Sequence, residues 1–268
     1  MKTTRHLRHG PVEGFRFGYA PIPYVPVVPV YCYFLDGLLI DTAQRHRQAD
    51  VLRTLADRPL QQIVLTHFHE DHSGNVLALH RRFGVPVFAG ELTARRVGAG
   101  FPVLPYEQFW FGRIEPCPGI QPLPEVVETN RYRLQPIHTP GHSDDHYVFL
   151  EANEGWLFAG DFYIGNLKIF RRGENFQQHI DSARRLLACD FDTLFCGHNP
   201  VLTNGKAAIL RKIEYLEAFR ERARHFHGQG LSLPEIRRRM RLSENYLLKI
   251  FTFNDVGVDL MIEAALRS

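Results

Sequence analysis

The sequence predicts a layered α/β domain followed by a helical segment, and three observations lead to this fold class. Short apolar runs typical of buried strands alternate with helical patterns over residues 1–205. From Lys206 onward, the apolar spacing is that of helices alone. The length of 268 residues fits one or two domains, since a domain takes about 150 residues. We therefore expect an α/β domain over 1–205 and a helical C-terminal domain over 206–268.

The first half of the chain carries strand and helix patterns in turn. Residues 11–35 are rich in Pro, Val, Tyr and Phe, which predicts irregular edge strands. Further strands are predicted over 38–41, 63–66 and 85–88, and helices over 44–58 and 74–83. Gly and Pro are frequent over 98–130, which predicts a long loop with short strands.

The second half continues this alternation and then becomes helical. Strands are predicted over 133–137, 146–151, 155–159 and 193–196, with a helix over 177–188. A long helix is predicted over 207–227, followed by shorter helices up to the end. Residues 233–248 have some likeness to a helix-turn-helix, but we expect a cap with an apolar stripe of Ile236, Met240, Leu247 and Ile250.

Composition excludes several classes of protein. Hydrophobic residues make up 44% and charged residues 23%, which argues against a mainly disordered chain. The longest apolar runs are broken by proline and do not reach the roughly 18 residues of a membrane span. No secretion signal is visible, and the four cysteines form no CxxC pair, so we expect a cytoplasmic protein. The tail from Lys206 holds 12 basic and 8 acidic residues, but we do not expect it to bind nucleic acid.

The segment 66–72, Thr-His-Phe-His-Glu-Asp-His, carries the strongest chemical signal. Three imidazoles and acidic side chains directly follow a buried strand, which is costly for folding unless they bind something. Imidazole nitrogen and carboxylate oxygen are ligands preferred by Zn²⁺ and similar ions. A solvated polar loop is the alternative.

Three later fragments favour the metal site over that alternative. His142 follows a strand within His-Thr-Pro-Gly-His, Asp161 ends one within Ala-Gly-Asp, and His198 ends another within Cys-Gly-His. In each case glycine stands beside the metal-capable residue and allows the backbone to approach closely. Side chains at several strand ends can converge on one pocket.

With these motifs in this order, the chain resembles the metallo-β-lactamase superfamily over residues 20–205. The resemblance rests on HxHxDH, the GH of HTPGH, the GD and the final GH. It implies an αββα sandwich and a site for two divalent metal ions, with zinc favoured and iron or manganese as alternatives. The ligands it implies are His67, His69 and His142 for the first ion, Asp71, His72 and His198 for the second, and Asp161 as the bridge.

This ligand set implies hydrolysis by a hydroxide shared between the two ions. Metal binding lowers the pKa of water to about 7, so that hydroxide is available at neutral pH. Asp71 would orient the hydroxide while it ligates, which makes it the expected catalytic residue.

The motifs also distinguish branches of the superfamily. Asp161 disfavours the main β-lactamases, which lack this residue, and the chain is too short for the inserted domain of the nuclease branch. The flavin-linked diiron branch differs in its ligands, and the glyoxalase II segment rich in glycine and cysteine is replaced here by residues 162–166. Residues 141–146, Gly-His-Ser-Asp-Asp-His, are similar to the acyl-CoA thioesterase branch of the alkylquinolone pathway. We therefore expect hydrolysis of a small-molecule thioester or ester. This likeness also implies that residues 1–205 form the catalytic domain and that the helical domain over 206–268 caps its active site.

Two other functions stay open. A lactonase would use the same metals on a cyclic ester. Alternatively, the helical tail could act as a regulatory module that contacts a protein or nucleic acid. A homodimer is compatible with either, and no membrane partner is expected.

Several other residues have two interpretations each. Asp41 could orient the histidine loop or cap a strand, and His146 could support a ligand or bond only to backbone. Tyr163 and Asn166 could line the substrate pocket, whereas Arg171 and Arg172 could bind an anionic carrier, although solvation at the surface is favoured. Core packing is expected for Cys196, and surface positions for His46, His80, His179, His225 and His227.

Overall fold

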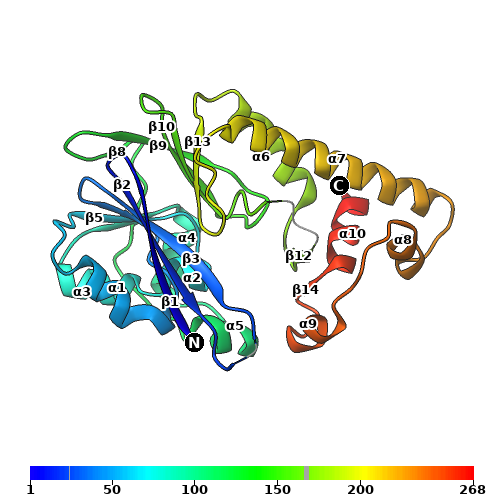
Figure 1. Cartoon of the computed structure of the whole chain (residues 1–268), viewed down its shortest axis with the longest axis horizontal. Coiled ribbons are helices and arrows are strands. Elements are labelled where there is room, and N and C mark those ends of the chain that lie inside the picture. Colours follow the sequence, from blue (N-terminus) through cyan, green and yellow to red (C-terminus); the bar gives the residue numbers. More distant parts are fainter. Residues whose placement is uncertain (24, 166–168) are drawn as a thin grey trace.

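The structure, a computed structural model, describes residues 1–23, 25–165 and 169–268. Two sheets pack face to face with helices on both outer sides, so the expected αββα sandwich is confirmed (Figure 1). The first sheet contains, in spatial order, β1 (Lys2–His9), β2 (Val12–Tyr19), β3 (Val28–Leu35), β4 (Leu38–Ile40), β5 (Gln62–Leu65), β6 (Val87–Ala89) and β7 (Gln121–Pro122). The second contains β13 (Thr193–Cys196), β11 (Trp156–Gly160), β10 (Tyr147–Glu151), β9 (Arg133–His138) and β8 (Val127–Glu128).

Successive residues of the central strands point into different layers. In β5, Val64 packs between the sheets, whereas Ile63 and Leu65 face the helices of the first sheet. In β10, Phe149 packs between the sheets, and its neighbours Val148 and Leu150 face the helices of the second sheet. This alternation follows from the two-residue period of a strand, and it explains why successive residues over 63–65 and 148–150 are all apolar.

The helices cover the two outer faces. On the first sheet lie α1 (Gln48–Leu55), α2 (Glu70–Ser73), α3 (Val76–Phe83), α4 (Glu91–Ala99) and α5 (Pro105–Phe111), and a 3₁₀ turn over Arg45–Arg47 leads into α1. The helices α6 (Phe176–Leu187), α7 (Gly205–Gly228), α8 (Leu233–Arg239) and α10 (Val258–Arg267) share the core that covers the second sheet. Within the described ranges, none of the helices combines the length and apolar character needed to cross a membrane.

A short ribbon ties the C-terminal region back to the α/β domain. Strand β12 (Phe170–Arg171) pairs antiparallel with β14 (Val256–Gly257), so the expectation of a wholly helical tail is wrong at this point. The two strands are short, and β14 stands directly before α10, which explains why no strand pattern is visible in the sequence. The pairing places the segment before α10 beside the loop that precedes α6.

One other local prediction needs correction, and one strand had no predicted counterpart. The segment 98–130 contains the helix α5, which begins at Pro105. The backbone N–H of Leu104, just before this helix, donates to the Glu107 carboxylate. Strand β1 extends the N-terminal ladder, because it pairs along its whole length with β2. Its sequence is mostly polar and exposed, so it has no apolar pattern.

The tail departs from the expected apolar stripe at α9 (Tyr246–Phe251). Ile236 and Met240 are buried in the core, as expected. Leu247 and Ile250 of α9 are 82% and 72% exposed, so their expected packing is wrong. The packed part of the tail therefore consists of α7, α8 and α10, with α9 at its surface.

Candidate metal centre

The histidine-rich segment lies where β5 ends and α2 begins. His67 and His69 precede α2, and Asp71 and His72 form its first turn. All four side chains are buried. The Asp41 carboxylate holds the start of this segment, because it accepts hydrogen bonds from the amide and the hydroxyl of Thr66, both at 2.8 Å.

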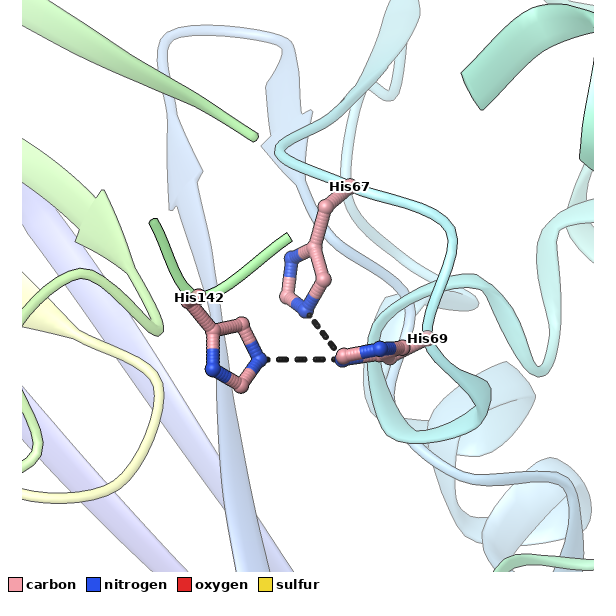
Figure 2. Close-up of side chains that lie close together, drawn as sticks. All are labelled: His67, His69 and His142. Atoms are coloured by element: carbon pink, nitrogen blue, oxygen red, sulfur yellow. Dashed lines mark hydrogen bonds between the residues drawn. The ribbon is translucent and has the colours of Figure 1, made fainter. Parts of the chain in front are cut away.

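Three imidazoles converge on one point and form the first candidate group, which we call the histidine triad. The Nε2 atoms of His67 and His142 each lie 3.0 Å from Nδ1 of His69 (Figure 2). The ligand atoms of the three residues all lie within 4.8 Å of one another. Buried nitrogen atoms that face one point fit the coordination of a single cation.

A mixed set of carboxylates and imidazoles forms the second candidate group, the acidic quartet of Asp71, His72, Asp161 and His198. Nε2 of His72 lies 3.0 Å from the Asp161 carboxylate. Nε2 of His198 lies 3.3 Å from Asp161 and 3.4 Å from Asp71. Asp161 also reaches the triad, because its Oδ2 lies 3.6 Å from Nε2 of His142.

The remaining candidate ligands lie at or near the ends of strands of the second sheet. His142 lies in the turn between β9 and β10, Asp161 follows β11, and His198 follows β13. Gly197 is required by this convergence, since a Cβ atom there would lie 2.7 Å from Oδ1 of Asp161. The structure thus brings all seven sequence-predicted residues into two adjoining groups.

Several candidate ligands also form hydrogen bonds on the side that faces away from the metal centre. Nδ1 of His72 lies 2.7 Å from the Asp41 carboxylate, as the first interpretation of Asp41 predicts. Nε2 of His146 accepts the backbone N–H of Asp161 at 3.1 Å, so His146 supports a candidate ligand through its backbone. These contacts fix the direction in which each candidate ligand points.

Burial and charge shift the pKa values of the two groups in different directions. Burial and the neighbouring imidazoles lower the pKa of His67 and His69 well below the ordinary value. Burial alone would lower the pKa of His72 too, but the Asp161 and Asp41 carboxylates raise it well above that value. Asp161 keeps its charge, because His198 and His72 lower its pKa against the effect of burial. The neutral imidazoles of His67 and His69 and the ionised carboxylates are in the protonation states that bind metal, whereas His72 would have to release its proton to do so.

A cleft of about 610 Å³ opens beside the triad. His69 and His142 lie in its wall next to Phe68 and Phe101, whose rings are 4.9 Å apart. The polar part of the wall includes the side chains of Arg96, Asp144, Arg171, Arg172 and Asp255. The cleft therefore has an apolar side and a charged side, both within reach of the candidate metal ligands.

Arg171 is mostly buried and ion-paired, so the favoured surface position is wrong. It pairs with Glu107 of α5, with Asp255 at 3.1 Å and with Glu70 at 3.9 Å. Arg172 is largely exposed. No pattern in the sequence indicates this cluster, because Arg171 and Asp255 lie 84 positions apart in the chain.

His179 is buried, so its predicted surface position is wrong. Its Nε2 lies 3.0 Å from Glu174, and it lies in the first turns of α6. Burial alone would raise the pKa of Glu174, but the imidazoles of His142 and His179 lower it to about 2. Lys212 of α7 is also buried, and its ammonium donates to the carbonyl of Phe162, the residue after Asp161. His179, Glu174 and Lys212 belong to no motif in the sequence.

The other predictions have mixed outcomes. Cys196 is buried in the core as expected, and His225 and His227 are exposed. His46 and His80 are half-buried, and each bonds to a backbone carbonyl. Tyr163 packs into the core, so its place in the pocket wall is not supported, while Asn166 lies outside the described residues.

Two curated proteins are similar to more than half of this chain. A hydroxyacylglutathione hydrolase of Aeromonas salmonicida is 31% identical over 173 residues, which is 62% of this chain and 58% of that protein. An atrochrysone carboxyl ACP thioesterase of Aspergillus aculeatus is 29% identical over 171 residues, which is 62% of this chain and 47% of that protein. The chain thus spans about half the length of such curated relatives.

Solved structures extend the likeness to nearly the whole chain. A metallo-beta-lactamase family protein from Thermus thermophilus has a TM-score of 0.69 and 23% identity, and the match covers 96% of this chain and 93% of that one. The sequence model of the metallo-beta-lactamase superfamily matches residues 25–198. Since this range is well over half of the chain and contains both candidate groups, the protein belongs to the metallo-beta-lactamase superfamily.

Proposed function

We propose that the protein is a metal-dependent hydrolase that cleaves a thioester or an ester. The observation that carries this proposal is the position of Asp161, whose carboxylate lies between the histidine triad and the rest of the acidic quartet. A bridging anion offsets the repulsion between two cations that lie about 3.5–4 Å apart. The thioesterase and the hydroxyacylglutathione hydrolase among the relatives agree with this class of reaction.

The two groups suggest how two divalent ions would be held. His67, His69 and His142 would bind the first ion through nitrogen, and Asp71, His72 and His198 would bind the second, with Asp161 shared. Such ions, zinc by preference or else iron or manganese, supply hydroxide at neutral pH and polarise the substrate carbonyl. All donors are nitrogen or carboxylate oxygen, which fits each of these metals.

The chain's own residues would orient the reactants. Asp71 is the proposed catalytic residue, because one of its oxygens lies 3.4 Å from His198 and the other 3.9 Å from His72, so the carboxylate spans the quartet. Phe68 lies against His69, with ring centroids 4.6 Å apart, and shields that side of the triad from water. The apolar wall formed with Phe101 would receive the carbon chain of a substrate.

We also propose that residues 1–205 form the catalytic domain and that residues 206–268 cap its active site. Asp255 supports this division, since it belongs to the C-terminal region and lies in the cleft wall. The four free thiols fit a reducing compartment such as the cytoplasm.

Metal analysis of the full-length protein, with hydrolysis assays on the same sample, tests the proposal. We expect about two metal ions per chain by elemental analysis. Acyl-CoA, glutathione thioesters, simple esters and lactones would be compared, and activity confined to lactones would favour a lactonase. His69→Ala should lose both metal and hydrolysis, whereas His225→Ala, an exposed control, should keep both.

Two outcomes would contradict the proposal. One is a protein that binds neither zinc nor iron nor manganese after reconstitution. The other is a metal-loaded protein that hydrolyses none of these substrates. A partner bound by the tail in the metal-free protein would then favour a regulatory module.

A further inference from the structure

In most histidines of the two groups, the ring nitrogen that faces away from the centre lies near an oxygen atom of the protein. Nδ1 of His67 lies 2.9 Å from the Thr66 hydroxyl. Nδ1 of His72 lies 2.7 Å from Asp41, and Nδ1 of His198 lies 2.7 Å from the Pro29 carbonyl. A group at this position fixes which nitrogen carries the proton and leaves the other nitrogen free to bind metal.

His142 has a different partner behind it. Its Nε2 faces the triad, and its Nδ1 lies 3.8 Å from Oε2 of Glu174. This Nδ1 atom is buried and has no hydrogen-bond partner within the described residues. At 3.8 Å the contact is longer than a hydrogen bond, yet Glu174 is the anion that faces the nitrogen.

Other contacts hold the Glu174 carboxylate in this place. One oxygen accepts the backbone N–H of Arg171 at 2.8 Å, and the other lies 3.0 Å from Nε2 of His179. The side chain is only 6% exposed. A buried carboxylate with fixed partners is a stable electrostatic feature, because it cannot turn toward solvent.

The backbone that carries His142 packs directly against the helix that carries His179. A Cβ atom on Gly141 would lie 2.7 Å from the backbone nitrogen of His179. The carbonyl of Gly141 also accepts the N–H of Asn175, at 2.8 Å. His142, Glu174 and His179 therefore belong to one tightly packed unit, in which movement of one residue displaces the others.

We propose that Glu174 is a positioning residue for His142. Its carboxylate keeps the proton of His142 on Nδ1, so that the lone pair of Nε2 faces the triad. His179 in turn holds the carboxylate in place. This inference rests on the proposed function in one respect, namely that His142 binds metal. It adds two residues outside the superfamily motifs to the machinery of the site.

The variant Glu174→Gln tests the role of the charge. Glutamine has nearly the same shape and can still accept the N–H of Arg171, so the turn is retained. We expect one of the two zinc ions to bind 10- to 100-fold more weakly, as is typical when an outer partner of a ligand is lost. Competition with a chromophoric chelator on the full-length protein measures this affinity. Glu91→Gln, at an exposed position on α4, is the matched control and should bind zinc like the wild type.

Nitrogen NMR of the metal-free protein provides a readout that does not depend on activity. In the wild type, we expect the His142 proton on Nδ1, and in Glu174→Gln we expect a mixture of both tautomers. If the variant keeps the wild-type zinc affinity and the same tautomer, the proposal is overturned and Glu174 serves only the turn at Arg171.

A second variant covers the case in which Glu174→Gln does not fold. His179→Gln retains Glu174 and its contact with Arg171, and it should weaken the same zinc ion severalfold. Unchanged affinity in a folded His179→Gln would contradict the proposed unit. A wild-type protein that binds two zinc ions but hydrolyses nothing would overturn the proposed function alone, whereas unchanged zinc binding in both variants would overturn this inference alone.

Discussion

The histidine triad and the acidic quartet adjoin each other but differ in how their charge is balanced. The quartet contains two carboxylates, which raise the pKa values of its two imidazoles, so it supplies negative charge of its own to a cation. The triad contains no carboxylate, and burial lowers the pKa of His67 and His69. A cation in the triad must therefore obtain its negative partners from outside, and the nearest carboxylates to His142 are Asp161 and Glu174.

Asp161 contacts both groups, so both would depend on its carboxylate. We predict that Asp161→Asn has the largest effect, because both proposed ions lose a ligand charge. Loss of a mere outer partner costs about 10- to 100-fold, so we expect hydrolysis to fall by on the order of 10³-fold or more. Elemental analysis and kcat/KM of the same preparation measure the two effects.

Asp190→Asn is the control for this variant, since Asp190 is 94% exposed and pairs only with Lys206 in the described structure. It should retain both metals and full activity. If Asp161→Asn retained two metals per chain at wild-type affinity, the two groups would not share this carboxylate, and the comparison would fail.

The next prediction concerns the ion network on the triad side. Arg171→Met leaves the buried carboxylates of Glu70 and Glu107, and the partly buried Asp255, without their shared cation. Breaking a buried ion pair on one side costs about 3–5 kcal/mol of unfolding free energy. Urea denaturation checks this value.

Arg172→Met is the neighbouring control, because Arg172 is 65% exposed and lies 3.8 Å from Asp255. Its change should stay within about 0.5 kcal/mol, as for other surface substitutions. Equal losses in both variants would show that the buried network contributes nothing particular to stability.

Sequence reasoning succeeded where chemistry is concentrated at strand ends. His67, Asp161 and His198 each follow a strand closely, and the sheet geometry alone brings such ends together. The central strands could be predicted too, because buried strands are continuously apolar. The mostly polar strand β1 was not predicted, because one of its faces is exposed and the other is at most half-buried, which leaves no apolar alternation to detect.

The supporting residues could not be predicted, because their burial depends on partners far along the chain. Lys212 donates to a carbonyl 50 positions away, and in its helix it resembles an ordinary surface lysine. Glu174 and His179 stand next to exposed residues in the sequence. Only the packing of α6 against the turn at Gly141 shows that they lie behind a candidate ligand.

The buried Lys212, which donates to the carbonyl of Phe162 next to Asp161, predicts that the stability of the protein depends on pH. Burial lowers its pKa from 10.5 to about 8. The folded protein thus releases this proton at a lower pH than the unfolded chain, and the unfolding free energy should rise between pH 8 and 10.5. The unfolding free energy should rise by about 3 kcal/mol in total. Below pH 8 the folded protein bears the full cost of burying the charged ammonium.

Denaturation with urea across this pH range would compare the wild type with Lys212→Met. The variant lacks the titrating group, so the rise attributable to Lys212 should disappear. Lys206→Met, at a partly exposed position of the same helix, should retain it. Parallel pH curves for the wild type and Lys212→Met would contradict the assignment.

The smallest predicted effect concerns Asp41, which supports the quartet as Glu174 is proposed to support the triad. Asp41 has a positive φ of 61°, a conformation that asparagine tolerates, so Asp41→Asn should preserve the backbone. We expect about a tenfold loss of affinity for the quartet's ion, at the low end of outer-partner effects, because asparagine can still accept one hydrogen bond. Asp57→Asn, at an exposed position, is the control.

The double variant Asp41→Asn with Glu174→Gln tests whether the triad and the quartet hold separate ions. If each residue supports a different ion, chelator titration should show both ions weakened, each by the factor found in its single variant, since independent sites give additive free energies. Coupling through Asp161 would instead make the double variant depart from additivity by 0.5 kcal/mol or more, roughly the smallest interaction energy between contacting sites. Loss of the same ion in both single variants would show that the triad and the quartet do not hold separate metals.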